Sequence, residues 1–163
     1  MFIYIARHAW AGERGDPRWP DDSLRELTPD GIDRYTKVVK AIAERGFEPE
    51  QIATSPYTRC RQTADLIAKY VAGKPTIVEL AALEPGSDVD ALVAWTNEQS
   101  GVDVCWVGHS PDVEELAAGL ISDDGLNIRF AKGAVAAIGF DGGAASVGDG
   151  VLHWLATAKS LGV

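Results

Sequence analysis

The sequence predicts an α/β fold: a three-layer sandwich with a mainly parallel central sheet flanked by helices, and a C-terminal antiparallel hairpin. Short apolar runs alternate along the chain with amphipathic segments of helical period, which is typical of parallel strands joined by helices. The run at 102–109, VDVCWVGH, is apolar almost throughout, as expected for a strand buried on both faces of a parallel sheet. We expect residues 1–163 to form one domain, because a chain of this length usually buries a single core.

The first half of the chain supplies two strand–helix units. Residues 2–5 are an apolar strand, and a polar loop with two prolines and two glycines follows it. Thr28 predicts a helix N-cap, and Gly46 ends that helix. The helical period predicts that its buried positions are Ile32, Tyr35, Val38, Val39 and Ile42. Residues 51–55 predict a second strand, and a second helix covers about 56–71.

The second half continues the alternation. TIVEL at 76–80 predicts a third strand, and a helix over about 87–99 follows it. The positions of that helix that we expect to be buried are Leu92, Val93 and Trp95. The fourth strand precedes a helix over about 111–121. The segments 133–140 and 150–157, joined by a Gly-rich turn, predict the antiparallel hairpin.

Composition excludes several classes of function. The formal net charge of −9 argues against a nucleic-acid partner, because neutralising phosphates requires clustered Lys and Arg. No apolar run approaches the roughly 18 residues of a membrane helix, so we expect no membrane association. The N-terminus lacks the features of a signal peptide, so the expected location is the cytoplasm. Cys60 and Cys105 are too few for a disulfide framework.

Polar residues follow three of the predicted parallel strands. The first strand ends in Arg7 and His8, the second leads into Arg59, and the fourth ends at His109. Ligands of such sheets bind beyond the carboxyl ends of the strands, so these four side chains are expected to converge on one rim. The helix N-termini at the same rim also favour anions.

This set of side chains is suited to phosphoryl transfer. Arginine forks match phosphate oxygens, and a neutral imidazole can attack phosphorus to form a covalent intermediate. The other imidazole and the guanidinium groups then stabilise the charge on the equatorial oxygens. These cations replace a metal ion, so we expect neither a metal nor another cofactor.

Four motifs, ARHAWA, LRELTPDG, TSPYTRCRQTA and CWVGHSPDVEELA, resemble in order those of the histidine phosphatase superfamily, in particular its short branch, the SixA-like phosphohistidine phosphatases. The resemblance covers most of the chain and implies a phosphoglycerate-mutase-like fold. It implies a phosphatase with His8 as nucleophile that removes phosphate from phosphohistidine in a protein, in signal transduction. It also implies that Arg7, Arg59 and His109 hold the phosphoryl group, and that Arg25 is a further phosphate ligand.

The sequence departs from the family pattern at two points. The family's Arg-His-Gly motif has Ala9 in place of its glycine. The acid/base glutamate of larger members has no secure counterpart: Glu84 in LEPGSD is the nearest candidate, and Glu79 and Asp88 are weaker ones.

Other residues near the motifs have structural interpretations. Arg25 either binds phosphate or pairs with Asp22, and both interpretations stay open. His153, inside the last apolar strand, is expected to be structural, and Arg14 and Arg61 are expected to be solvated.

The main rival chemistry is that of a serine hydrolase. VGHSPD places Ser110 between a buried strand and a helix, as in a nucleophile elbow. However, Asp112 replaces the second glycine of that motif, and Pro111 lacks the N–H that would begin an oxyanion hole. His153 would have to complete the triad from the middle of a strand.

Other chemistries fit less well. A cysteine phosphatase requires an arginine six residues after the cysteine, but Leu66 and Pro111 follow Cys60 and Cys105 at that distance. The chain contains no Walker loop and no metal-ligand spacing.

The substrate is the least determined feature. A phosphohistidine-bearing protein and a small phosphorylated molecule both remain, so a general phosphomonoesterase of the same superfamily is the alternative function. A non-catalytic phosphate-binding module is a further alternative. Trp10 and Trp19 are expected to flank the mouth of the site, where either could contact substrate.

Overall fold

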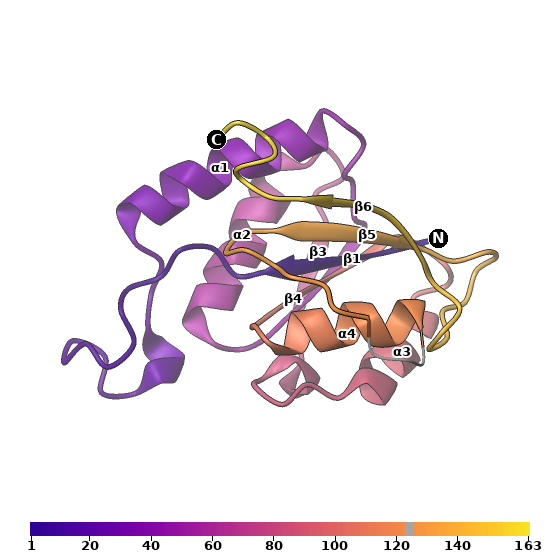
Figure 1. The fold of residues 1–163 in the computed structure, drawn as a ribbon, viewed down its shortest axis with the longest axis horizontal. Helices are drawn as coiled ribbons and strands as arrows, with labels where there is room; N and C mark the ends of the chain where they lie inside the picture. The colour runs from indigo at the N-terminus through magenta and orange to yellow at the C-terminus, as the bar shows by residue number, and fades with distance from the viewer. Residues whose placement is uncertain (123–125) are drawn as a thin grey trace.

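The structure is a computed structural model that describes residues 1–122 and 126–163. Its centre is a six-stranded sheet, and four α-helices flank the sheet (Figure 1). The elements are β1 (Phe2–Arg7), α1 (Pro29–Ala43), β2 (Gln51–Thr54), α2 (Thr58–Tyr70), β3 (Thr76–Glu79), α3 (Val89–Asn97), β4 (Val104–Gly108), α4 (Asp112–Ile121), β5 (Val135–Gly139) and β6 (Val151–Ala156), with short 3₁₀ turns η1 (Asp22–Leu24) and η2 (Ala81–Leu83). The fold class predicted from the sequence is confirmed.

The sheet is parallel at one side and antiparallel at the other. The strand order is β3-β2-β4-β1-β5-β6. Strands β3, β2, β4 and β1 pair in parallel, whereas β5 pairs antiparallel with both β1 and β6. The predicted C-terminal hairpin is therefore present, and it extends the sheet beyond β1.

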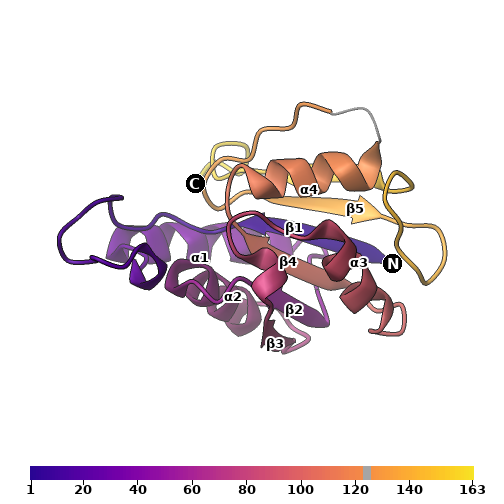
Figure 2. The ribbon, with the colours of Figure 1, turned by 90° about the horizontal axis from the view of Figure 1, so that it is seen from below.

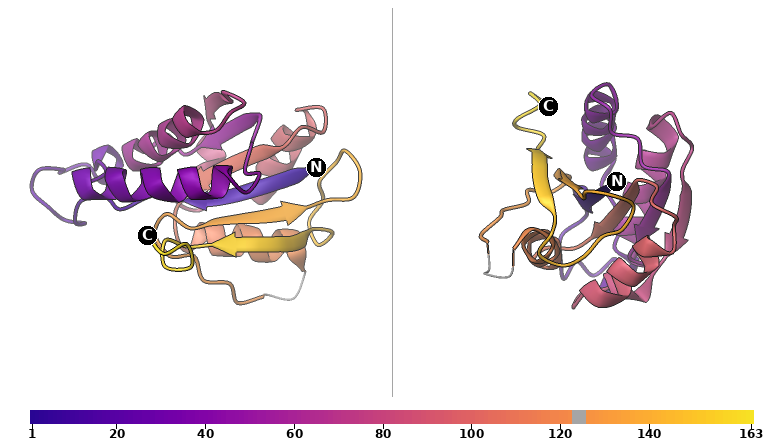
Figure 3. Two further views of the ribbon diagram at one scale, coloured as in Figure 1. Left: turned by 90° about the horizontal axis from the view of Figure 1, so that it is seen from above. Right: turned by 90° about the vertical axis from the view of Figure 1, so that its right-hand side faces the viewer.

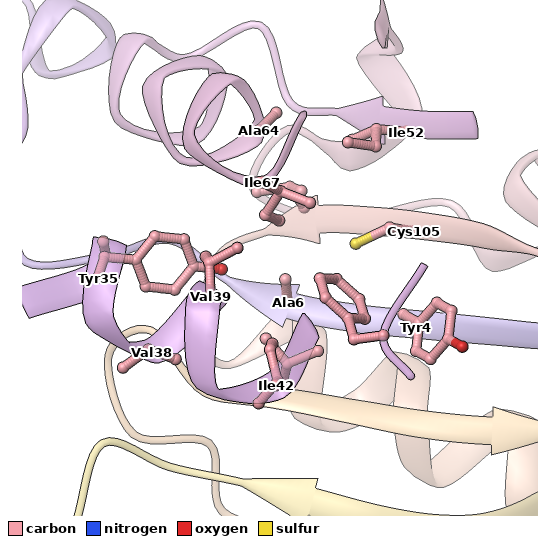
Figure 4. Packing of buried hydrophobic residues seen from close by; sticks show 14 of the residues in the cluster. Tyr4, Ala6, Tyr35, Val38, Val39, Ile42, Ile52, Ala64, Ile67 and Cys105 are labelled. Carbon is pink, nitrogen blue, oxygen red and sulfur yellow. The ribbon is translucent and has the colours of Figure 1, made fainter. Parts of the chain in front are cut away.

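The two faces of the sheet carry separate halves of the core. Successive side chains of a strand point to opposite faces, so Tyr4 and Ala6 of β1 pack beneath α1 and α2, while Ile3 and Ile5 pack beneath α3 and α4. Figures 2 and 3 show the helix pairs on the two sides of the sheet, and Figure 4 shows the packing on the α1–α2 side. The helices that deliver the site residues are thus held by apolar contacts on both faces.

Most predicted helix boundaries lie within two or three residues of the observed ones. The Thr28 hydroxyl accepts a hydrogen bond from the Gly31 N–H at 3.0 Å, which confirms the predicted N-cap of α1. Helix α2 begins at Thr58, two residues after Pro56. Helix α3 begins at Val89, because Asp88 caps it.

The predicted core positions are largely buried. In α1, four of the five predicted positions are buried, and Ile32 is half-buried. In α3 only Leu92 of the three is fully buried, while Val93 and Trp95 are half-buried. Helix α3 therefore covers the sheet with a narrower face than its sequence predicts.

The segment between β1 and α1 projects from the carboxyl end of the parallel strands (Figures 1 and 2). An antiparallel bridge between Ala11 and Leu27 closes its base. A Cβ at Gly31 would lie 2.2 Å from the carbonyl oxygen of Trp10, so only glycine permits this close approach of α1 to the end of β1. The projecting segment is thereby fixed beside the strand ends.

Within residues 1–122 and 126–163, no helix is both long and apolar enough to cross a membrane.

We expect Ile3→Ala to destabilise the fold by about 2–5 kcal/mol, because it removes a fully buried side chain from the centre of the α3–α4 half of the core. Urea denaturation would measure this loss. The matched control is Val151→Ala on β6, where the side chain is 61% exposed and the change should stay within about 0.5 kcal/mol. Equal midpoints for both variants would contradict the assigned core.

Candidate active site

The register of two parallel strands brings the two histidines together. Arg7 of β1 pairs with Gly108 of β4, and the next residue of each strand is His8 or His109. The His8 N–H donates to the Gly108 carbonyl at 3.0 Å, which continues the pairing. The imidazole rings have centroids 5.6 Å apart, and both side chains are almost fully buried.

The protonation of His8 is set by the backbone carbonyl of the next residue, Ala9. Nδ1 lies 2.8 Å from the Ala9 carbonyl oxygen, which only accepts, so Nδ1 carries the proton. The pKa of His8 is lowered to about 3, mainly by burial and less by the neighbouring Arg59, His109 and Arg7, against the raising effect of the Ala9 hydrogen bond. His8 is therefore neutral near pH 7, with a free electron pair on Nε2.

His109 is fixed in the opposite tautomer. The Arg59 guanidinium, which only donates, lies 3.2 Å from Nδ1, so Nε2 carries the proton and donates to the Ser55 hydroxyl at 2.9 Å. Burial, and then the charge of Arg59, lower the pKa of His109 to about 4. The Cys60 sulfur lies 3.5 Å from Nε2, and burial raises the pKa of that thiol to about 12, so it stays protonated.

The first turn of α2 delivers Arg59 to the site. Its guanidinium donates to the Asp22 backbone carbonyl at 2.9 Å and lies 3.2 Å from the Asp22 carboxylate. Tyr57 lies beneath the same guanidinium, with 5.0 Å between its ring centre and the arginine Cζ. Burial lowers the pKa of Arg59, but a guanidinium remains charged in proteins. The site therefore holds a buried cation whose direction is fixed by Asp22, Tyr57 and His109.

Arg7 is held by the segment that precedes β5. Its Nη1 donates to the Phe130 carbonyl at 2.7 Å, and its backbone N–H donates to the Ala134 carbonyl at 3.0 Å. Burial lowers its pKa, and the carboxylate of Glu114 opposes that shift. Because β5 is antiparallel to β1, the residues before β5 lie at the same edge as the residues after β1.

These side chains line a cavity of about 470 Å³ at the carboxyl ends of the parallel strands. Its lining residues are Arg7, His8, Arg14, Asp22, Arg25, Arg59, Pro85, Gly86, His109, Ser110, Pro111, Asp112 and Lys132. Among the described residues, five cations and two carboxylates line it, so its charge is +3 with both imidazoles neutral. The cavity is therefore suited to an anion.

The structure brings together His8, Arg7, Arg59 and His109, the four residues that the sequence predicted to converge. Arg25 lines the same cavity, but its Nε donates to the Asp22 carboxylate at 2.9 Å. Arg25 therefore pairs with Asp22 and also borders the cavity, and its role as a phosphate ligand stays a prediction.

The candidate acids are not brought to the cavity. Glu84 is half-buried and does not line it, although Pro85 and Gly86 do. Glu79 accepts a hydrogen bond from Arg61 at 3.2 Å, and Asp88 caps α3 at the Ala91 N–H.

The aromatic residues expected at the mouth pack elsewhere. Trp10 lies beneath Arg34, with 4.4 Å between its ring centre and the arginine Cζ, and Trp19 packs against Gly12 and Arg18. Neither tryptophan lines the cavity.

The serine-hydrolase constellation is not assembled. The Ser110 hydroxyl donates to the Glu114 carboxylate at 2.9 Å. His153 is exposed on β6 and packs edge-on against Phe2, and it does not line the cavity. Ser110 consequently lacks an imidazole base from His153.

Sequence reasoning missed three contributors to the site. Ser55 orients His109, and its position directly after β2 is the signal that could have found it. Asp112 lines the cavity and accepts the Gly86 N–H at 3.0 Å. Lys132 also lines the cavity, as does Arg14, which was expected only to be solvated. The sequence did not predict Lys132, because it precedes an antiparallel strand. The rule that ligands bind beyond the carboxyl ends of the strands applies to parallel strands.

No group of three or more His, Cys, Asp or Glu side chains arranged to hold a metal ion occurs in the described part of the chain.

Comparison with known proteins assigns the family. The family model of the histidine phosphatase superfamily, branch 1, matches residues 3–84. An uncharacterised protein of Picosynechococcus sp. is 31% identical over 151 residues, which cover 90% of this chain and 88% of that protein. The chain belongs to the histidine phosphatase superfamily. The resemblance inferred from its motifs is thus confirmed.

Two further matches concern SixA proteins. The chain is 28% identical over 159 residues to the phosphohistidine phosphatase SixA of Escherichia coli, with 94% of this chain and 92% of that protein covered. A solved structure of the protein histidine phosphatase SixA with tungstate has a TM-score of 0.84 and 26% identity, with 99% of each chain covered. The similarity therefore extends over the whole fold, including the C-terminal hairpin.

The buried neutral histidines predict a pH-dependent stability. A histidine whose pKa is lowered on folding stabilises the fold above its unfolded pKa of about 6.5, and this stabilisation is lost as the pH falls toward about 3 for His8. Between pH 6.5 and 4, the unfolding free energy of the wild type should fall more steeply than that of His8→Gln, by up to about 1.4 kcal/mol per pH unit. Urea denaturation across this range tests the expectation, and parallel pH profiles of the two proteins would refute it.

Proposed function

We propose that this chain is a metal-independent phosphatase that forms a covalent phosphohistidine on His8 and removes phosphate from phosphohistidine carried by a protein. The observation that carries the proposal is the state of His8, which is buried, neutral and protonated on Nδ1. Its Nε2 electron pair is thus available as a nucleophile inside a cationic cavity. The similarity to proteins named as phosphohistidine phosphatases supports the same activity.

In the first step, Nε2 of His8 attacks the phosphorus of the substrate. A bond forms between Nε2 and phosphorus, and the bond between phosphorus and the substrate imidazole breaks, with its electron pair returning to the leaving nitrogen. Arg7 and Arg59 bind the equatorial oxygens, and His109 orients the Arg59 guanidinium by accepting its hydrogen bond at Nδ1. Because these groups are held in place by protein hydrogen bonds, little reorganisation opposes the reaction.

In the second step, water attacks the phosphorus of phospho-His8. The bond between phosphorus and Nε2 breaks, its electron pair returns to Nε2, and the water proton passes to phosphate or solvent. His8 regains its neutral state and its Nδ1 hydrogen bond to Ala9. The guanidinium groups supply the charge stabilisation that a metal ion gives in other phosphoryl transfers.

The leaving group favours phosphohistidine over alkyl phosphates. Phosphohistidine that carries a proton on its second ring nitrogen releases a neutral imidazole, whose conjugate acid has a pKa of about 6.5, whereas a serine alkoxide needs a proton from an acid. Glu84 lies outside the cavity, and the Asp22 carboxylate is bound to Arg25 and Arg59. Asp112 is the other carboxylate among the described lining residues, and its oxygen holds the Gly86 N–H.

The proposed partner is a phosphohistidine-bearing protein of the cytoplasm, with a role in signal transduction. A small phosphorylated molecule is the alternative substrate, and the leaving-group experiment below separates the two.

We expect His8→Ala to abolish turnover, and His109→Ala and Arg59→Ala to reduce kcat by about 10²–10³-fold, because each removes a group that stabilises the transferring phosphoryl. Quenching the wild type during turnover of a radiolabelled substrate should trap an acid-labile, base-stable phosphate on His8. The matched control is His153→Ala, which changes the exposed histidine of β6 and should retain full activity. Label on Ser110, or turnover by His8→Ala, would overturn the proposed nucleophile.

A second expectation concerns the leaving group. The wild type should hydrolyse a phosphohistidine peptide at least about 10²-fold faster than the matching phosphoserine peptide, since general acid catalysis is typically worth about 10²–10⁴ in rate. Glu84→Gln should leave phosphohistidine hydrolysis unchanged.

Asp112→Asn completes this comparison, because asparagine still accepts the Gly86 N–H through its amide oxygen. If the wild type hydrolyses phosphoserine as fast as phosphohistidine, and Asp112→Asn or Glu84→Gln destroys that activity, the protein is a general phosphomonoesterase instead.

A further inference from the structure

The charge of the cavity is opposite to that of the chain. The formal net charge of the protein is −9, yet the described lining of the cavity carries five cations and two carboxylates. Clefts lined by one sign of charge concentrate oppositely charged ligands. The cavity therefore attracts anions although the net charge of the protein is negative.

The five cations fall into an inner and an outer set. Arg7 and Arg59 are directed by protein hydrogen bonds and lie beside the histidines. Arg25 has a side chain only 12% exposed and is engaged by the Asp22 carboxylate and the Gly12 carbonyl. These three cations are held inside the site.

Arg14 and Lys132 form the outer set. Both are exposed, and within residues 1–122 and 126–163 neither forms a salt bridge. The charge of Arg14 makes the smallest contribution to the low pKa of Asp22, which is due first to the hydrogen bond from Arg25. The two side chains come from different segments, the loop between β1 and α1 and the turn before β5, and both line the same cavity.

We propose that Arg14 and Lys132 form an outer anion site that recognises acidic side chains next to the phosphorylated residue of a protein substrate. The inference rests on the proposed phosphatase function and names the kind of protein surface that the site accepts. A cavity of about 470 Å³ lies within the size range of small-ligand pockets, so it has room for groups around the phosphoryl. Arg14 and Lys132 line the cavity and are exposed, so they are accessible to the surface of a macromolecule.

The outer site acts on encounter and binding. An exposed ion pair is weak, and charge complementarity between partners raises the association rate and the specificity more than the affinity. The effect is therefore expected in kcat/KM for charged substrates, about three- to ten-fold for each cation, and it should weaken at high salt.

The test uses three phosphohistidine peptides of equal length, in which the residues flanking phosphohistidine are Glu, Gln or Lys. For the wild type, kcat/KM should follow the order Glu, Gln, Lys. Arg14→Glu and Lys132→Glu should each lower the ratio of kcat/KM for the Glu peptide over the Lys peptide by about ten-fold or more. The control is Lys37→Glu, which makes the same charge change at an exposed position of α1 outside the cavity and should preserve the wild-type ratio.

If Lys132→Glu hydrolyses the Lys peptide with a higher kcat/KM than the wild type does, misfolding cannot explain its lower ratio. The inference is overturned if the wild type hydrolyses the three peptides with equal kcat/KM. It is also overturned if Lys37→Glu changes the ratio of kcat/KM as much as Arg14→Glu and Lys132→Glu do. The same flanks on phosphoserine peptides separate this result from the proposed function. If only phosphoserine is hydrolysed, the phosphohistidine assignment fails, while the order of the three flanks still tests the outer site.

Discussion

The parallel pairing of β1 with β4 is the constraint on which the site depends. The register aligns Arg7 with Gly108, so His8 and His109 leave adjacent strands at the same level. A slip of one residue would turn the side chains of β1 to opposite faces. Because Ile3 and Ile5 are fully buried on one face and Tyr4 on the other, the core strongly opposes such a slip. The hydrophobic packing therefore fixes the separation of two catalytic candidates that lie 101 positions apart.

The charges of the site are arranged before any anion binds. Burial next to guanidinium groups keeps both imidazoles neutral. The Asp22 carboxylate balances part of the positive charge by contacting Arg25 and Arg59. A fixed set of donors around a neutral imidazole is the arrangement that the proposed electrostatic stabilisation of a phosphoryl group requires.

The segment after β4 has the local sequence of a nucleophile elbow but a different structural role. VGHSPD resembles a nucleophile elbow, yet the Ser110 hydroxyl donates to Glu114. The same carboxylate accepts the Phe130 N–H at 3.2 Å, and the Phe130 carbonyl in turn accepts from Arg7. Ser110 and Glu114 thus support the segment that directs an arginine into the cavity.

The sequence by itself determined the α/β class, the order of the elements and the four residues, Arg7, His8, Arg59 and His109, that meet in the cavity. It did so because hydrophobic period, helix caps and strand-end polar residues are local properties. Only the tertiary structure decided what depends on contacts distant in sequence. The pairing of Arg25 with Asp22 leaves Arg25 at the cavity wall, and the path of the chain after η2 leaves Glu84 outside it. Because β5 runs antiparallel to β1, Lys132, which precedes β5, lies at the same edge of the sheet as the carboxyl ends of the parallel strands. The sequence did not predict this position, because the direction of a strand is set by its pairing in the sheet and not by its own residues.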